Sequence, residues 1–553
     1  MLRMLGAVVT SMPLAFGCLA ATPTQNVLKA GEPVEANLNA GSTLAYVLPL
    51  HAGDYVKATI EQRGASGEIW ILAPDGSRLR KFTADSCKKQ FSFIADVAGD
   101  HTLRVKAGEQ SDDFRLRIDQ IEPLSERLAL GTSRPQYSVP AIEALQKELS
   151  PQAVERFWQH VAESGTPLVT PVAGDNRHQL VTFLWRGNAD TKNVVVLGSF
   201  HTRPLIDYLM DQIPNTDVWH LTVKLPAGAR FVYTLSANDP LVEEGPGPRA
   251  AERMATQQAD PLNPKKSWNY TRGAGVHEYS SMVELPGAPP QPWIVKKPGV
   301  SEGKLESTTF KSDLLGNERK ITIYTPPGYR KDGSPADLVV LFDENAYIDR
   351  VPTPTILDNL IAAGKIRPAV AVLIANPSQD TRIKELPPNE KFADFLANEL
   401  FPWVRSRYNV TDDPGRTVVA GSSFGGIAAT YAALRHSEIF GNVLCQSGSF
   451  WWAPDHRYGD EPVTETGWLA KEFIKNPKFP IRFYMDAGLF EVDYLGSGGA
   501  ILEPSRNMRD VLLAKGYDVH YREFASGHDY LNWRGTLADG LITLVGPSQS
   551  AKR

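Results

Sequence analysis

A chain of 553 residues is too long for one hydrophobic core, so we expect about two to four domains. With 42% hydrophobic and 22% charged residues, the composition is that of an ordinary globular protein. The formal net charge of −5 argues against nucleic acid or an anionic membrane surface as the main partner.

Residues 1–21 have the pattern of a signal peptide. Arg3 precedes an apolar stretch, residues 5–16, and the small residues that follow predict cleavage after Ala20 or the next alanine. That stretch is short for a transmembrane helix, and no later apolar run is long enough to span a bilayer. Cys18 stands where a lipoprotein signal places its acylated cysteine, so a lipid anchor is the minor alternative. We expect export to the periplasm, with no transmembrane segment in the mature chain.

Only Cys87 and Cys445 would remain after cleavage, and they fall in different predicted domains. A disulfide framework is therefore not expected, even in an oxidising compartment. No cysteine and histidine cluster has the spacing of a zinc site, so the sequence predicts no metal and no cofactor.

Residues 25–122 predict an all-β sandwich. Short alternating apolar runs such as "DYVKATIEQ" and "GEIWILAPDGS" recur at roughly ten-residue spacing, separated by turn residues. The pattern resembles the small β-sandwich modules appended to many secreted hydrolases. No cluster of polar residues in this segment points to catalysis.

Residues 140–293 predict a second β-rich domain with a helical connector at its start. Residues 141–165 have helical spacing, and strand-like runs then extend from about Leu168 to Glu284. The proline-rich segment "LPGAPPQPW", residues 285–293, is typical of a stiff linker.

Residues 296–548 predict an α/β domain. Buried-looking apolar runs alternate there with helical stretches, which is the pattern of a parallel sheet covered on both faces. The expected strands lie in "RKITIYTPPGY", "DLVVLFDENAY", "PAVAVLIAN", "TVVAGSSF", "NVLCQSGSF", "FPIRFYMDAG" and "DVHYREF".

The segment Gly421-Ser422-Ser423-Phe424-Gly425 stands between one of these strands and a helix of small residues. A G-x-S-x-G sequence in that context is typical of a nucleophile elbow, in which the glycines permit a strained turn that presents the serine. Ser423 is therefore the candidate nucleophile. Ser422 is out of frame and is interpreted as a turn or packing residue.

A serine hydroxyl needs a base, and in an α/β-hydrolase the histidine follows the last core strand. His528, in "REFASGHDYLNWRGTL", meets that condition. His436 on the helix after the elbow, His456 in a tryptophan-containing loop and His520 within a strand are interpreted as surface or packing residues.

The third member of the set should be a carboxylate just after the penultimate strand. Glu491 is the first choice, with Asp493 in reserve, and Asp486 still lies in the strand. An oxyanion hole would use the backbone N–H of Phe424 and an amide near Asn345 in the loop "FDENAY".

These motifs, together with "RIKELPPNEKF" and "GHDYLNWRG", resemble the enterochelin (ferric enterobactin) esterase family of the α/β-hydrolase superfamily. The segments "VTFLWRGN", "TDVWHLTVKLPAG" and "ADPLNPKKSW" are similar to the N-terminal domain of that family. The resemblance covers roughly residues 141–545, most of the chain. It implies an α/β-hydrolase catalytic domain preceded by β-rich domains, with Ser423, His528 and Glu491 as the catalytic set.

The resemblance also suggests substrate contacts. Arg382 in "TRIKELP" could pair with an anionic catecholate, the alternative being a surface salt bridge to Glu385. Arg534 is expected at the substrate site or bracing the histidine loop. The tryptophans expected to form an aromatic wall, of which at least one could instead belong to the core, are Trp451, Trp452 and Trp533.

The resemblance implies a serine esterase that opens the ester bonds of an enterobactin-like trilactone siderophore, with iron arriving in the substrate. Two features depart from the cytoplasmic members, namely the export signal and the β-sandwich before Ile121. The alternatives are a secreted feruloyl or carbohydrate esterase and a non-catalytic siderophore-binding protein. The middle domain favours the siderophore.

Overall fold

The computed structural model describes residues 26–62, 67–84, 88–129, 131–242, 253, 256–268, 279–454, 467–492 and 500–547. The predicted signal peptide, Cys18, Cys87, His456 and Asp493 lie outside these residues. The chain divides into two compact units, residues 1–129 and residues 130–553. No helix in the described ranges is long and apolar enough to cross a membrane.

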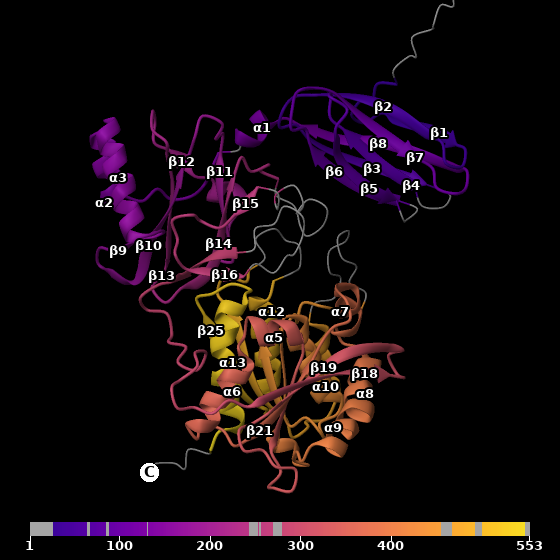
Figure 1. Ribbon diagram of the computed structural model, residues 1–553, viewed down its shortest axis with the longest axis vertical. Coiled ribbons are helices and arrows are strands. Elements are labelled where there is room, and N and C mark those ends of the chain that lie inside the picture. Colours follow the sequence, from indigo (N-terminus) through magenta and orange to yellow (C-terminus); the bar gives the residue numbers. More distant parts are fainter. Residues whose placement is uncertain are drawn as a thin grey trace, which may run out of the picture. The chain divides into compact units, whose positions relative to one another are not determined.

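The first unit is a β-sandwich, drawn in indigo to purple in Figure 1. Its two four-stranded antiparallel sheets have the orders β1-β8-β3-β6 and β2-β7-β4-β5. In β7, Leu103 and Val105 point into the core while the intervening Arg104 is exposed, as the two-residue period of a strand requires. The elements are β1 (Pro33–Leu38), β2 (Thr43–Leu50), β3 (Tyr55–Gln62), β4 (Gly67–Leu72), β5 (Arg78–Ala84), β6 (Lys88–Ile94), β7 (Gly99–Lys106), β8 (Asp112–Glu122) and α1 (Leu124–Leu128).

The second unit begins with two helices instead of the continuous helical stretch that the spacing of residues 141–165 indicated. The helices are α2 (Pro140–Lys147) and α3 (Pro151–Ser164). The hydroxyl of Ser150 accepts a hydrogen bond from the N–H of Ala153 (3.1 Å), and Pro151 occupies the first helical position. A proline there has no N–H with which to continue the preceding helix, so the chain restarts with a new cap.

The β-rich part that follows packs two sheets around buried aromatic rings. One sheet has the order β12-β13-β10-β9 and the other β11-β14-β17-β16, with β15 paired to β14. Phe183 stacks on Phe200 at 5.4 Å and contacts Tyr233 edge-on at 4.8 Å. The elements are β9 (Leu168–Val172), β10 (Asp175–Arg186), β11 (Val194–Gly198), η1 (Leu205–Tyr208), β12 (Asp211–Gln212), β13 (Val218–Pro226), β14 (Arg230–Ala237), β15 (Gln257–Gln258), β16 (Lys266–Trp268) and β17 (Tyr279–Glu284).

The C-terminal part is built on an eight-stranded sheet of order β18-β19-β21-β20-β22-β23-β24-β25. The first two pairings are antiparallel and the rest are parallel. The predicted fold class is therefore confirmed. The strands are β18 (Lys304–Ser312), β19 (Asn317–Thr325), β20 (Asp337–Leu341), β21 (Ala369–Ile374), β22 (Thr417–Ser422), β23 (Asn442–Gln446), β24 (Arg482–Gly488) and β25 (Asp518–Phe524).

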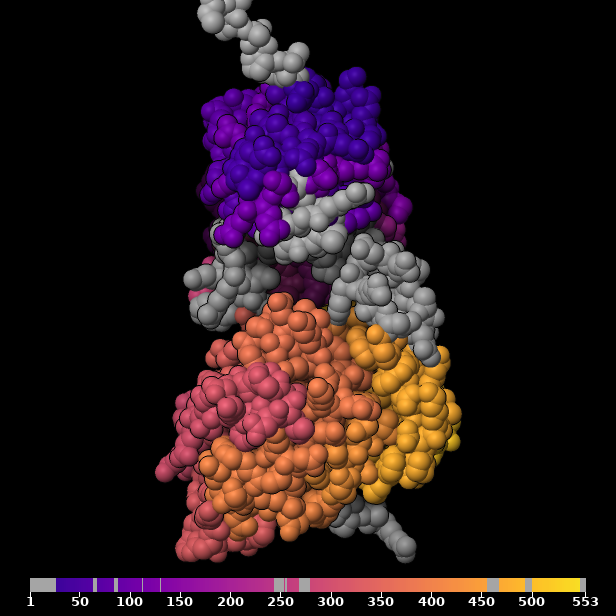
Figure 2. All heavy atoms as spheres, turned by 90° about the vertical axis from the view of Figure 1, so that its right-hand side faces the viewer, coloured from indigo at the N-terminus to yellow at the C-terminus, as the bar shows by residue number. Residues whose placement is uncertain are grey.

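Helices cover both faces of this sheet, so its central strands are buried throughout. One core contains residues of α8, α10, α11 and α12, and the other contains residues of α6 and α13. In the space-filling view of one face, the residues from about 300 onward pack into one continuous body (Figure 2). The helices are α5 (Glu344–Asp349), α6 (Thr353–Ala362), α7 (Gln379–Glu385), α8 (Glu390–Phe395), η2 (Leu396–Leu400), α9 (Phe401–Arg407), η3 (Pro414–Arg416), α10 (Phe424–Arg435), α11 (Trp468–Lys475), α12 (Leu502–Ala514) and α13 (Tyr530–Val545).

In open α/β sheets, ligand sites form at the carboxyl ends of the parallel strands. The loops after β20, β22, β23, β24 and β25 all leave the sheet from that edge, because these strands are parallel. The candidate serine, carboxylate and histidine lie in three of these loops.

Candidate active site

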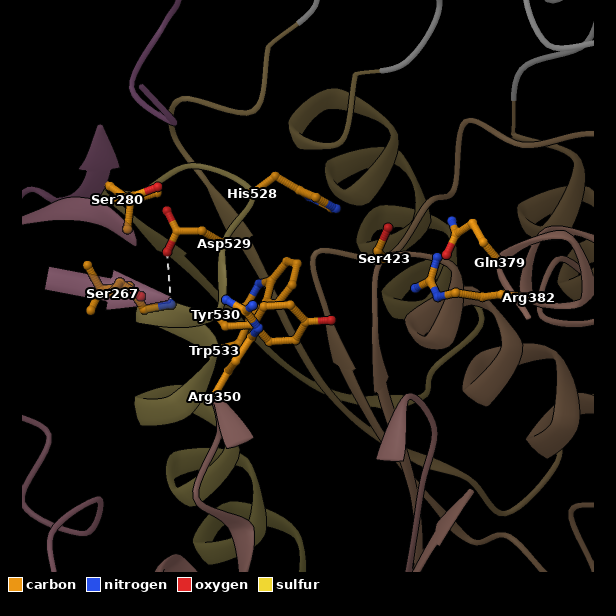
Figure 3. Close-up of a pocket in the computed structure, with 12 residues that line it drawn as sticks. Ser267, Ser280, Arg350, Gln379, Arg382, Ser423, His528, Asp529, Tyr530 and Trp533 are labelled. Atoms are coloured by element: carbon orange, nitrogen blue, oxygen red, sulfur yellow. Dashed lines mark hydrogen bonds between the residues drawn. The ribbon is translucent and has the colours of Figure 1, made fainter. Parts of the chain in front are cut away.

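Ser423 lies in the turn between β22 and α10, with φ 59° and ψ −122°. A side chain other than glycine rarely adopts a positive φ, so the turn is strained. It also needs glycines around it: a Cβ on Gly421 would stand 2.5 Å from the carbonyl carbon of Gly425. The sequence motif therefore forms the strained turn of a nucleophile elbow, and Figure 3 shows the Ser423 hydroxyl at the cavity.

His528 and Glu491 come together from two different loops. His528 Nδ1 lies 2.5 Å from Glu491 Oε1, and the Glu491 side chain is 1% exposed against 40% for the histidine. The imidazole meets the ring of Trp533 edge-on at a centroid distance of 4.8 Å. In Figure 3 the imidazole extends toward Ser423 across the cavity. A buried carboxylate on Nδ1 leaves Nε2 as the ring atom that can exchange a proton with a hydroxyl.

The Glu491 carboxylate is itself held in place. Its Oε2 accepts hydrogen bonds from the N–H of Gly488 (2.5 Å) and the hydroxyl of Ser447 (2.9 Å). Ser447 Oγ in turn accepts a hydrogen bond from the indole N–H of Trp533 (3.0 Å). Both carboxylate oxygens are thus engaged, which fixes the orientation of the acid relative to the imidazole.

Of the other two candidate carboxylates, Asp486 is in the described residues and stands at the end of β24, next to this network. It is buried, and its Oδ1 accepts from the N–H of Ser447 (3.2 Å). Burial raises the pKa of Asp486 to about 8, and the nearby Glu491 charge acts in the same direction. The structure therefore brings Glu491, and not Asp486, to His528.

The Ser423 hydroxyl lies 3.4 Å from the hydroxyl of Ser449. Within the described ranges this is the hydrogen-bonding contact of the Ser423 hydroxyl. Hydrogen bonds between nucleophile and base are often long without substrate and shorten when the substrate binds.

The loop after β20 carries the second predicted oxyanion donor. Phe424 directly follows Ser423, and Asn345 is an exposed residue in the first turn of α5. Amides in the first turn of a helix have no partner within the helix, so they are available to an anion. Asp343 precedes α5 in a left-handed conformation, with φ 55° and ψ 51°.

Arg382 pairs with Asp343, and Glu385 is not its partner. Its Nε and Nη2 donate to the two Asp343 oxygens at 2.7 and 2.8 Å, and Asn376 also donates to that carboxylate (2.5 Å). Glu385 instead accepts from Arg319 (2.8 Å). A forked guanidinium–carboxylate pair fixes both groups, so Arg382 supports the loop after β20 and also lines the cavity.

A cavity of about 360 Å³ lies in front of Ser423 and His528 (Figure 3). Arg350 and Arg382 give it two cationic groups. Val232, Ser267 and Ser280 of the middle domain line it as well. The cavity is therefore formed jointly by the sheet of β14, β16 and β17 and by the loops of the catalytic domain.

The aromatic wall differs from the prediction. Trp533 is among the described cavity-lining residues, although it is only 2% exposed and its ring packs against the imidazole of His528. Trp451 instead packs on Phe424 at 5.8 Å, and Trp452 packs on Trp468 at 5.7 Å. Trp451 belongs to the hydrophobic core around α10, where its apolar ring is removed from water, and the partly buried Trp452 packs against that core.

Arg534 also lies outside the described cavity lining. It donates to Gln291 (2.7 Å) and to Glu284 (3.3 Å), and so joins α13 to the linker and to β17. Burial lowers the pKa of Arg534. Of the two expected roles of Arg534, these contacts support bracing of the histidine loop and not substrate binding.

Sequence reasoning missed several cavity residues. Tyr530 is one of them, and its place only two residues after His528 could have suggested that it lines the cavity. No local pattern in the sequence marks Arg350, Gln379 or the two middle-domain serines, since only the tertiary fold brings them to the cavity beside Ser423. Among the described residues, no group of three or more histidine, cysteine, aspartate or glutamate side chains is arranged to hold a metal ion.

The doubly covered sheet, the strained serine turn and the histidine–glutamate pair define an α/β-hydrolase with the architecture of an esterase. The Esterase family model matches residues 312–544, and the model described as "Enterochelin esterase, N-terminal" matches residues 180–294. The chain is 32% identical to the iron(III) enterobactin esterase of Dickeya dadantii over 428 residues, which covers 72% of this chain and 94% of the relative. It therefore belongs to the enterobactin esterase family.

Two further relatives agree with this assignment. The iron(III) salmochelin esterase of an Escherichia coli O6:H1 strain is 30% identical over 73% of this chain and 98% of its own. The enterobactin esterase of Shigella flexneri, solved in the presence of enterobactin, has a TM-score of 0.56 at 30% identity, covering 70% of this chain and 97% of that one.

The two buried carboxyls can be separated by substitution. We expect Glu491→Gln to lower kcat on a small chromogenic ester by about 10²- to 10⁴-fold, because the amide no longer favours the correct imidazole tautomer. Asp486→Asn should keep kcat within about threefold, since that side chain does not contact His528. Steady-state kinetics with circular dichroism of both variants tests this, and a larger loss for Asp486→Asn would reverse the assignment.

The raised pKa of Asp486 also predicts a pH dependence of stability. The folded protein holds this proton more tightly than the unfolded chain, so the contribution is fully present below about pH 4 and is lost as pH rises to about 8. In the wild type this proton makes the free energy of unfolding decrease as pH rises across this range. Asp486→Asn should therefore make that decrease less steep, by at most about 1.4 kcal/mol per pH unit. Urea titrations from pH 4 to 8 measure it. The exposed Asp313→Asn should retain the wild-type slope, and an unchanged slope in Asp486→Asn would contradict the prediction.

Proposed function

We propose that this protein is a serine esterase that hydrolyses the ester bonds of an enterobactin-like trilactone siderophore. The observation that carries the proposal is the His528–Glu491 pair facing Ser423 across a cavity that the middle domain helps to line. The relatives that match both the middle and the catalytic domain are named for enterobactin or salmochelin. Iron enters this proposal as cargo of the substrate.

In the proposed reaction, the Ser423 oxygen attacks the carbonyl carbon of a seryl ester while His528 Nε2 takes the hydroxyl proton. The backbone N–H of Phe424 and an amide at the start of α5, near Asn345, receive the negative charge of the tetrahedral intermediate. The intermediate collapses to an acyl-enzyme, and the imidazolium gives its proton to the departing serine alkoxide. Water, deprotonated by His528, then attacks the acyl-enzyme and releases the carboxylic acid and Ser423.

Charge supports this substrate class. Six catecholate oxygens around Fe³⁺ leave a ferric tris-catecholate with a net negative charge, whereas the protein as a whole carries −5. Arg350 and Arg382 line the cavity, and Arg382 is paired with Asp343. A guanidinium can donate hydrogen bonds to catecholate oxygens and stack on a catechol ring, so these two side chains would favour the substrate.

The feruloyl or carbohydrate esterase alternative has weaker support. The xylanase/feruloyl esterase of Xylanibacter ruminicola is 25% identical over 48% of this chain, compared with 72% for the Dickeya relative. The siderophore esterases also share the middle domain, which supplies Val232, Ser267 and Ser280 to the cavity. A non-catalytic binding protein would not require a His528–Glu491 pair on the same cavity as Ser423.

Adjacent serines offer a matched test of the proposal. With ferric and iron-free enterobactin as substrates, we expect wild type to release dihydroxybenzoyl-serine products and Ser423→Ala to lose at least about 10³-fold in kcat. Ser422→Ala, one residue away and buried, should retain most activity. Chromatography of the products measures both. Turnover of a feruloyl ester alone would reject the siderophore, and undiminished turnover by Ser423→Ala would reject the mechanism.

We further propose that residues 1–21 export the protein to the periplasm. In a Gram-negative host, the mature protein should appear in the osmotic-shock fluid, and its mass should be that of a chain that begins at residue 21 or 22. The minor alternative predicts a lipid-modified chain beginning at Cys18 in the membrane fraction, and Cys18→Ala would release it. Retention of the full-length chain in the cytoplasm would overturn the export proposal.

A further inference from the structure

The turn that carries His528 rests directly on the middle domain. The N–H of Arg230 at the start of β14 donates to the carbonyl of Ala525 (2.9 Å). Two residues later, a Cβ on Gly527 would stand 1.6 Å from the carbonyl oxygen of Ser199. The backbone of the histidine turn and the backbone after β11 are therefore in such close contact that no side chain fits between them.

The Ser199 side chain makes a second connection. Its hydroxyl donates to Asp529 Oδ2 (2.5 Å) and accepts from the N–H of Val232 (3.3 Å), so the rotation of the hydroxyl is fixed. Asp529 Oδ1 accepts from the N–H of Leu531 (2.9 Å) and caps α13. One carboxylate thus ties the residue after His528 both to its own helix and to the neighbouring domain.

A third set of contacts holds the start of α13. Arg534 donates to Gln291 (2.7 Å), and Gln291 donates to the carbonyl of Leu531 (2.8 Å). Glu284 accepts from Arg534 (3.3 Å) and from Arg230 (2.8 Å). The segment from Ala525 to Arg534 is therefore fixed at both ends by residues of the middle domain and the linker.

His528 needs this support because little else constrains it. Its side chain is 40% exposed and is held by Glu491 on one atom and by Trp533 on one edge. The position of its backbone consequently sets the distance from Nε2 to Ser423. A displacement of about 1 Å in a reacting group can cost about 10²-fold in rate.

We propose that Ser199 is a positioning residue for catalysis, acting through its hydrogen bond to Asp529 and its backbone contact with Gly527 to hold His528 in line with Ser423. The inference rests on the proposed catalytic role of His528, and it does not depend on which ester is the substrate. The middle domain then takes part in the chemical step in addition to lining the cavity.

The experiment uses the full-length mature protein and 4-nitrophenyl acetate, a small ester that needs no contact with the middle domain. We expect Ser199→Ala to lower kcat about tenfold with KM changed less than twofold, and Ser199→Thr, which keeps a hydroxyl, to recover most of the rate. Asp529→Asn should give a similar loss, and the double variant should lose no more than either single one. Thermal unfolding of each variant is followed in parallel.

The matched control is Ser236→Ala, which removes a different hydrogen-bonded hydroxyl of the middle domain; Ser236 is buried, bonded to Thr256 (2.6 Å) and outside the described cavity lining. It should leave kcat unchanged at a similar cost in stability. Wild-type kcat in Ser199→Ala, or an equal loss in Ser236→Ala, would overturn the proposal. So would additive losses for Ser199→Ala and Asp529→Asn. If Ser199→Ala does not fold, the proposal is tested by the kcat of Asp529→Asn, which should fall about tenfold, and of Ser199→Thr, which should stay near that of the wild type. A wild-type enzyme that cleaves the small ester but no siderophore would reject the proposed substrate and leave this inference standing.

Discussion

Three residues with positive φ stand at the carboxyl ends of three adjacent parallel strands, and the geometry of the site depends on them. Asp343 follows β20, Ser423 follows β22 and Ser447 follows β23. Each such residue costs roughly 1–3 kcal/mol, so each persists only because its surroundings hold it. Asp343 is held by Arg382, Ser423 by the glycines of its turn, and Ser447 by Glu491 and Trp533. The strained positions carry the proposed nucleophile and orient the groups beside it.

Two buried carboxyls near the site stand in different surroundings. Glu491 accepts hydrogen bonds from Gly488 and Ser447 and contacts His528. Asp486 accepts a hydrogen bond from the N–H of Ser447, and burial raises its pKa. The orientation of the Glu491 carboxylate, which His528 contacts, therefore depends on the loop after β24 and on Ser447.

The middle domain is part of the site as well as a neighbour of it. Val232, Ser267 and Ser280 extend the lining of the cavity beyond the loops of the α/β domain. The same sheet contacts the histidine turn through Ser199 and Arg230. Binding surface and catalytic alignment thus come from the same few strands, so a change in how this domain packs would alter both.

The sequence by itself determined the fold class and the places of Ser423 and His528 in it, because these features are local. Apolar runs, helical spacing and the glycine turn are properties of short segments, and chain order places the histidine after the last strand. The tertiary structure decided the rest. Glu491 and Asp486 are both candidates from the sequence, and only the path of the loop after β24 shows that the Glu491 carboxylate contacts His528. Trp451 and Arg534 are not among the described residues that line the cavity, because Trp451 packs on Phe424 and Arg534 bonds to β17, and the spacing of residues along the chain does not predict such packing.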